Sequence, residues 1–145
     1  MKIRELLVTL WVLALFGIGT AHAATAVTVY ISPICGCCEK YVDYLRENGF
    51  AVSAVNTSDM DAIKKKYGMS HIASCHTALV NGYVVKGHVP AGTTRKMLRE
   101  KPSIIGISAP GMPLNSHGME EMQKGTLAIY AVPKDGKEPY QFSVE

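Results

Sequence analysis

The sequence predicts an α/β fold: a central mixed sheet flanked by helices, with a C-terminal extension made of a loop and a β-hairpin. Three observations predict it. Short runs rich in β-branched residues alternate with segments whose apolar residues recur at helical spacing. Asn81-Gly82 separates two such runs, which is a strong local signal for a hairpin. Three of the four cysteines fall between Cys35 and Cys38, directly after the first β-rich run.

Residues 1–23 are predicted to form a secretory signal peptide. Basic residues stand near the start, an apolar run extends over 6–18, and Ala21 and Ala23 fit the small-residue positions of a cleavage site. An uncleaved membrane anchor is the alternative, but the apolar run is short for a spanning helix. Cleavage leaves 24–145 as an exported single domain with no membrane span.

Charge and cysteine usage narrow the function classes. The formal net charge is only +3, and no basic run interleaved with aromatic residues predicts nucleic-acid binding. Export exposes thiols to an oxidising compartment, so a framework of structural disulfides is one alternative. Clustering at one turn argues against it, because a framework spreads its cysteines to close long loops. Adjacent Cys37 and Cys38 also rarely pair with each other.

The first strand and the first helix flank the cysteine turn. Residues 27–31 form a β-rich run, and a helix is expected from about 37 to 48. Cys38, Val42 and Leu45 fall on one stripe of that helix, which predicts its buried face.

A second strand and a second helix follow. We expect the strand near 50–56 and the helix N-cap at Thr57-Ser58, because hydroxyl oxygens accept hydrogen bonds from the unpaired amides of a helix start. The spacing of Met60, Ile63 and Tyr67 predicts a buried stripe on this helix.

The hairpin is the clearest local signal. The β-rich runs 77–80 and 83–85 flank Asn81-Gly82, a pair preferred in type I′ turns. A short helix is then expected over 93–100, because Pro102 restricts the residue before it.

The C-terminal part is expected to extend the same domain. The glycines and prolines of 106–118 predict a surface loop and exclude a central strand. Two further strands are expected, at 126–132 and at 140–144.

The order of these elements is the thioredoxin-like plan, and the handedness of βαβ units favours one compact arrangement of it. In this plan Cys35 stands just before the first helix, with Cys37 and Cys38 in its first turn. Unpaired amides and the helix dipole stabilise thiolate there. Cys35 and Cys38 keep the spacing of a redox CxxC pair, and Cys37 adds a third sulfur that suits a soft metal.

Two residues outside the turn are candidates for the same site. The fold places the residues just before the hairpin beside the first helix, so Cys75 is expected to approach the other cysteines. A buried Cys75 that acts as a small hydrophobe is the alternative. His88 follows the hairpin on the same side, where it could bind metal, donate a hydrogen bond to a thiolate or serve only structure.

Met112, Met119 and Met122 lie in and just after this glycine- and proline-rich loop, which we take, for the site, as the loop from Gly106 to Met122. Thioether and thiolate both favour Cu(I), and we expect the loop to fold over the cysteine turn with Met112 or Met119 toward the sulfurs. Packing against the core is the alternative for these methionines. Zinc is a further alternative, although structural zinc sites more often use two separated cysteine pairs than one CxCC motif.

Five blocks of the sequence, taken together, resemble the CopG-like copper-resistance proteins, which are small exported bacterial proteins with a thioredoxin-like fold. The blocks are residues 32–38 with the CxCC motif, 74–78, 82–90, 110–113 and 116–120. Their joint occurrence over most of the exported chain makes the resemblance specific.

The resemblance implies copper handling in the periplasm, with several Cu(I) ions bridged by cysteine sulfurs. It implies this ligand set: Cys35, Cys37, Cys38 and Cys75, with His88, Met112 and Met119 as further candidates. It gives no role to His117.

We interpret the chain as an exported, monomeric copper-binding protein that holds a multinuclear Cu(I)–thiolate cluster and contributes to copper resistance. The alternative is an enzyme, a thiol-disulfide or copper oxidoreductase in which Cys35 is the nucleophile and Cys38 resolves the mixed disulfide. A third interpretation is a copper chaperone for an efflux system. Copper ions and periplasmic efflux or chaperone proteins are the partners that these interpretations name.

Overall fold

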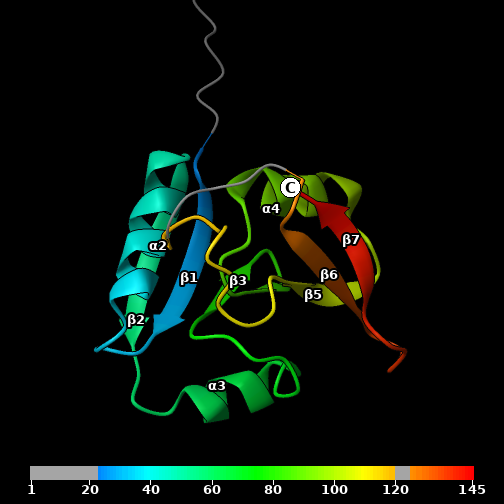
Figure 1. Ribbon diagram of the computed structural model, residues 1–145, viewed down its shortest axis with the longest axis horizontal. Helices are drawn as coiled ribbons and strands as arrows, with labels where there is room; N and C mark the ends of the chain where they lie inside the picture. Colours follow the sequence, from blue (N-terminus) through cyan, green and yellow to red (C-terminus); the bar gives the residue numbers. More distant parts are fainter. Residues whose placement is uncertain (1–22, 120–124) are drawn as a thin grey trace, which may run out of the picture.

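The computed structural model describes residues 23–119 and 125–145 (Figure 1). The predicted signal peptide therefore lies, apart from its last residue, outside the described residues, as does Met122 of the predicted loop. Within the described part, no helix is long and apolar enough to cross a bilayer.

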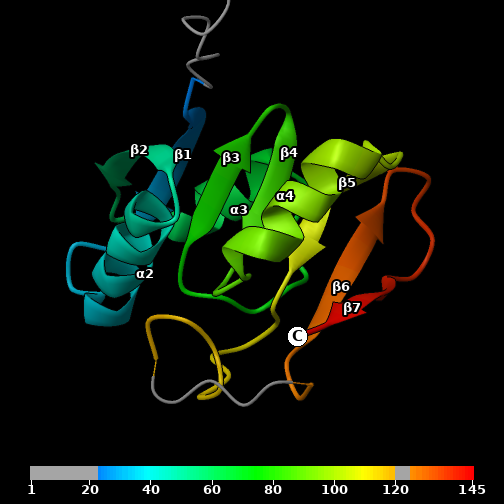
Figure 2. The same ribbon diagram turned by 90° about the horizontal axis from the view of Figure 1, so that it is seen from above.

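Seven strands of the described chain form one mixed sheet in the order β2-β1-β3-β4-β5-β6-β7. The strands are β1 (Thr25–Ile31), β2 (Phe50–Asn56), β3 (Thr77–Val80), β4 (Tyr83–Lys86), β5 (Ile104–Ser108), β6 (Ala128–Pro133) and β7 (Tyr140–Val144). The helices are α2 (Gly36–Glu47), α3 (Met60–Lys66) and α4 (Ala91–Glu100). Figure 2 shows α2 and α4 on one side of the sheet and α3 on the other.

The strand pairings confirm the thioredoxin-like α/β fold. β1 pairs in parallel with β2 and antiparallel with β3, and β4 continues β3 as a hairpin. The hairpin turns at Asn81 and Gly82, both of which have positive φ, as a type I′ turn requires. β6 and β7 extend the sheet as the predicted C-terminal strands.

The larger core lies between the sheet and helices α2 and α4. The predicted stripe of α2 is confirmed: Cys38, Val42 and Leu45 are buried, together with Tyr41. The Tyr41 hydroxyl donates a hydrogen bond of 2.6 Å to the carbonyl of Val89, so its one polar atom is satisfied in the core. This contact ties α2 to the segment that carries His88.

Helix α3 differs from its prediction in two respects. Its N-cap is Asp59, whose carboxylate accepts from the amide of Ala62 at 2.9 Å, and not the preceding Thr57-Ser58. The helix also buries none of its residues, so the expected stripe of Met60 and Ile63 is only half-buried. A helix this short covers too little of the sheet to enclose a full face.

The expectation that 106–118 is entirely loop was wrong at its beginning. Residues Ile104–Ser108 form β5, which lies between β4 and β6 and joins the C-terminal strands to the sheet. Gly106 permits this pairing, because a Cβ at that position would overlap the backbone of Val84 on the neighbouring strand. A glycine that reads as a loop residue is here required by close strand contact.

We predict that Gly106→Ala destabilises the protein by about 3 kcal/mol, because the added methyl can be accommodated only by moving two paired strands apart. Urea unfolding followed by circular dichroism measures the loss. Gly92→Ala is the matched control: Gly92 lies in the first turn of α4, and nothing lies within 4 Å of a Cβ placed there. Equal stabilities of the two variants would contradict the close-contact explanation.

Candidate metal centre

The CxCC motif forms the turn between β1 and α2. Cys35 is the N-cap residue of α2, and Cys37 and Cys38 lie in its first turn, as predicted. Cys35 and Cys38 are joined by a disulfide, with their Cα atoms 5.3 Å apart. Cys37 is free, and its Sγ lies 3.4 Å from the Sγ of Cys35. Cys38 is fully buried, whereas Cys35 and Cys37 are half-buried and reachable from solvent.

Cys75 joins these three cysteines from a distant part of the sequence. It lies two residues before Thr77, which begins β3 and pairs with Tyr30 near the end of β1. The four sulfur atoms all lie within 4.8 Å of one another. The predicted convergence is therefore confirmed. Cys75 is half-buried, and burial, followed by the nearby Cys37, raises the pKa of its thiol to about 12.

Two buried histidines extend this cluster on the side of Cys75. The Nδ1 atom of His76 lies 3.4 Å from the Cys75 sulfur, and the Nε2 atom of His88 lies 3.6 Å from it. These three donor atoms all lie within 4.8 Å of one another. The structure thus brings His88 to the predicted place and adds His76, which the sequence offered no way to orient.

Backbone carbonyls fix the tautomer of both histidines. Nε2 of His76 lies 3.0 Å from the carbonyl oxygen of Gly87, and Nδ1 of His88 lies 2.6 Å from that of His117. A carbonyl oxygen only accepts, so each of these nitrogens carries the proton. The other nitrogen of each ring then presents its lone pair to the Cys75 sulfur, an arrangement in which the second ring nitrogen orients a metal-binding imidazole.

Burial keeps both imidazoles neutral. It lowers the pKa of His76 to about 3, with a smaller contribution from His88, and it lowers the pKa of His88 as well. Tyr41 stacks on the ring of His76 with 4.6 Å between centroids and meets His88 edge-on. Neutral imidazole is the form that binds metals, so neither side chain would have to lose a proton to bind one near neutral pH.

The segment after β5, residues 109–118, is called here the strap, and it runs from β5 toward α2 (Figure 2). Its Gly118, at φ 85°, is so close that an added Cβ would lie 3.3 Å from both the Cys37 carbonyl oxygen and Nδ1 of His88. The ring of His117 stacks on Tyr44 of α2 at 4.0 Å. The expectation that this segment folds over the cysteine turn is confirmed at these residues.

The two methionines of the prediction differ in exposure. Met112 lies in the strap with 53% of its surface exposed, so it does not pack into the core. Met119 follows the strap, is half-buried, and donates its backbone N–H to the carbonyl of Ser116 at 3.1 Å. A role for either as a copper ligand stays a prediction.

Sequence reasoning missed two contributors to the site. One is His76: the sequence gives nothing that fixes the direction of its side chain, and its place beside Cys75 is the only signal available. His117 was given no role, and its ring indeed faces Tyr44, but its backbone carbonyl orients His88. A contribution made through a backbone atom leaves no mark on residue type, so no motif could have revealed it.

We predict that the metal-free protein loses stability as the pH falls below 6.5. The unfolded state binds a proton at His76 near pH 6.5, whereas the folded state resists it down to about pH 3. Stability is therefore fully present above 6.5 and declines on acidification by about 1.4 kcal/mol per pH unit for each such histidine. Urea unfolding across this pH range measures the slope of unfolding free energy against pH.

His76→Gln should flatten this slope, whereas His71→Gln, at an exposed histidine, should not. Equal slopes for wild type and His76→Gln would contradict the prediction.

Comparisons with known proteins agree with this geometry. A family model described as "Protein of unknown function, DUF411" matches residues 72–119, a stretch that contains Cys75, both site histidines and the strap. Comparison with curated proteins gives no significant match. Two solved structures, named "Copper resistance protein copG" in forms 1 and 2, are each 33% identical to this chain with a TM-score of 0.76; each match covers 84% of this chain and 98% of the other. With that identity over almost the full length of those structures, the chain belongs to the CopG family of copper resistance proteins.

Proposed function

We propose that the reduced protein is an exported, monomeric copper-binding protein of the periplasm that holds several Cu(I) ions in a cysteine-thiolate cluster and contributes to copper resistance. One observation carries the proposal: four sulfur atoms from two distant segments lie within 4.8 Å of one another. The copper resistance named for the related structures supports copper as the metal. The signal-like start of the chain supports export.

The donor set favours Cu(I) over harder ions. Thiolates are soft ligands, and Cu(I) accepts few of them without a strict geometry. Sulfurs this close together suit bridging between ions, because one thiolate can bind two metals. Zinc would instead require four donors in a tetrahedron around a single ion. The neighbouring imidazoles of His76 and His88 supply nitrogen ligands on the Cys75 side of the cluster.

Met112 and Met119 are the proposed thioether ligands of the set. Thioether sulfur binds Cu(I) and, unlike thiolate, does not form disulfides in an oxidising compartment. The exposure of Met112 supports a ligand that exchanges ions with solvent or with a partner protein. Efflux or chaperone proteins of the periplasm are the partners we expect for this exchange.

The disulfide between Cys35 and Cys38 favours a second candidate function, a thiol-disulfide or copper oxidoreductase. Half-buried Cys35 is the accessible sulfur and buried Cys38 the resolving one. In the copper reaction, the two thiols lose two electrons and two protons and form the disulfide, and two Cu(II) ions each take one electron to become Cu(I). The same oxidation removes two thiolate ligands, so it also links the redox state to copper binding.

We predict that the reduced protein binds more than one Cu(I) ion under anaerobic conditions, and that Cys75→Ser lowers this number while the fold is retained, because serine has similar volume but a harder oxygen. Native mass spectrometry after Cu(I) reconstitution gives the count.

His88→Gln should weaken Cu(I) affinity about tenfold through loss of an oriented imidazole. His71→Gln is the control outside the site. A single bound copper, or retention of Zn(II) against Cu(I), would overturn the cluster proposal.

We also predict that the protein reduces insulin disulfides poorly, because the adjacent Cys37 and a metal-filled site would obstruct the approach of a protein substrate to Cys35. Turnover with dithiothreitol as reductant, monitored by insulin precipitation, tests this. Cys35→Ser and Cys37→Ser form a matched pair, since only the first removes a member of the disulfide. Steady turnover that survives Cys37→Ser and is lost in Cys35→Ser would favour the enzyme over the binding protein.

A further inference from the structure

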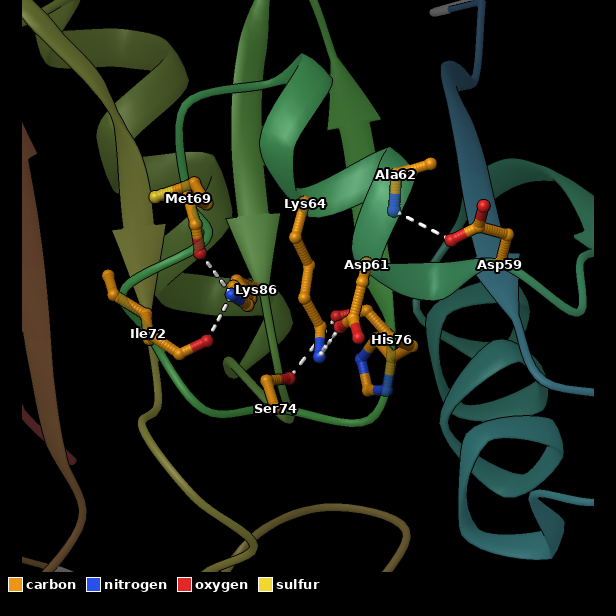
Figure 3. A network of polar contacts seen from close by, with 9 residues as sticks. All are labelled: Asp59, Asp61, Ala62, Lys64, Met69, Ile72, Ser74, His76 and Lys86. Atoms are coloured by element: carbon orange, nitrogen blue, oxygen red, sulfur yellow. Dashed lines mark hydrogen bonds and ion pairs between the residues drawn. The ribbon is translucent and has the colours of Figure 1, made fainter.

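Lys86 is a fully buried lysine beside the metal centre. It is the last residue of β4, two positions before His88, and its exposed fraction is 0%. A buried ammonium is costly unless its protons are donated to acceptors. The ion pair nearest to it joins Asp61 to Lys64 at 3.4 Å and involves no atom of Lys86 (Figure 3). A salt bridge therefore does not explain how the buried ammonium of Lys86 is stabilised.

The acceptors of Lys86 are backbone carbonyls. Its Nζ donates to the carbonyl oxygens of Met69 and Ile72, both of which are buried residues (Figure 3). These carbonyls belong to the connection between α3 and β3, residues 67–76, which forms neither helix nor strand. Hydrogen bonds from a charged donor are stronger than neutral ones, so one side chain replaces part of the bonding that a regular element would provide.

Cys75 lies in this connection, three residues after Ile72. The intervening stretch is held from the other side, where the amide of Gly111 in the strap donates to the carbonyl of Ala73 at 2.7 Å. The stretch of backbone that joins the carbonyls bound by the ammonium to Cys75 is therefore short, and it is held at Ile72 and at Ala73.

The backbone of Lys86 makes a second attachment. Its carbonyl oxygen accepts from the amide of Ala109 at 3.0 Å and from the hydroxyl of Ser108 at 3.2 Å, where β5 passes into the strap. The strap in turn carries the His117 carbonyl that orients His88. Lys86 thus contacts both segments that converge on the Cys75 side of the cluster, one through its ammonium and one through its carbonyl.

We propose that Lys86 is a positioning residue of the metal centre: its ammonium fixes the 67–76 connection so that the Cys75 sulfur is held within the ligand cluster. The copper part of this inference rests on the proposed function, whereas the placement of Cys75 does not. The substitution that isolates the ammonium is Lys86→Met, which keeps an unbranched chain and removes the hydrogen-bond donors.

The first experiment measures the position of Cys75 without any metal. In a Cys37→Ser background with Cys35–Cys38 oxidised, Cys75 is the only free thiol, and its rate of alkylation by iodoacetamide reports its enclosure. Lys86→Met should raise this rate about tenfold, because two charge-assisted hydrogen bonds no longer oppose opening of the connection.

Val84→Ala in the same background is the matched control. Val84 is buried on the same strand and packs in the small core cluster with Met69 and Ile72, so its truncation loosens the same region without removing the ammonium. Alkylation should stay within about twofold of the background for this variant. Equal acceleration by both substitutions, or none by Lys86→Met, would overturn the proposal. If Lys86→Met fails to fold by circular dichroism, Lys86→Gln, which keeps one amide donor group, takes its place and should give an intermediate rate.

The second experiment uses the full set of cysteines. Anaerobic Cu(I) titration against bathocuproine disulfonate should show that Lys86→Met loses the ions that Cys75→Ser loses, and that Val84→Ala keeps them. Faster alkylation of Cys75 with an unchanged copper count would overturn the role in the metal centre. If the wild-type protein itself binds no Cu(I) while Lys86→Met still accelerates alkylation, the proposed function fails and the positioning of Cys75 by Lys86 stands.

Discussion

The register between β1 and β3 is the constraint on which the metal centre depends. Tyr30 pairs with Thr77 and Val29 with Ala78, so β3 begins level with the last residues of β1. Residues just before Thr77 must then lie beside the turn that starts α2. Because side chains alternate between the two faces of a strand, a slip of one residue would carry the wrong side chains to the α2 face. The stacking of His76 on Tyr41 marks the register that the protein adopts.

Backbone carbonyls orient the side chains that surround the four sulfur atoms. The imidazoles of His76 and His88 are oriented by the carbonyls of Gly87 and His117, which come from two different segments of the chain. Carboxylates often play this part in metalloproteins, but a carboxylate would add negative charge beside the thiolates that we propose for the reduced protein. Neutral carbonyls orient the rings without that cost. Gly118 contributes to the same arrangement, because the strap can approach α2 this closely only at a residue without a side chain.

Local signals in the sequence were sufficient for most of the fold. The cysteine turn, the stripe of α2 and the Asn81-Gly82 hairpin each depend on neighbours within a few residues, and each was predicted. Strand β5 was not, because Gly106 stands in it for a reason that lies on another strand, the carbonyl of Val84. The residues of the candidate site also differ in whether the sequence could predict their positions. The approach of Cys75 followed from the fold plan, whereas the direction of His76 and the carbonyl of His117 depend on tertiary packing.

The burial of Lys86 also depends on tertiary packing, and the sequence pattern around it does not predict it. At the end of a β-rich run, a lysine normally marks the place where a strand reaches solvent. Here the strand ends inside the protein, since β5 and the connection before β3 enclose it, and the cation is retained because two buried carbonyls need a donor. An irregular connection cannot satisfy its own backbone hydrogen bonds as a helix would. The charge placed inside the protein therefore compensates for the irregular backbone that brings Cys75 to the other cysteines.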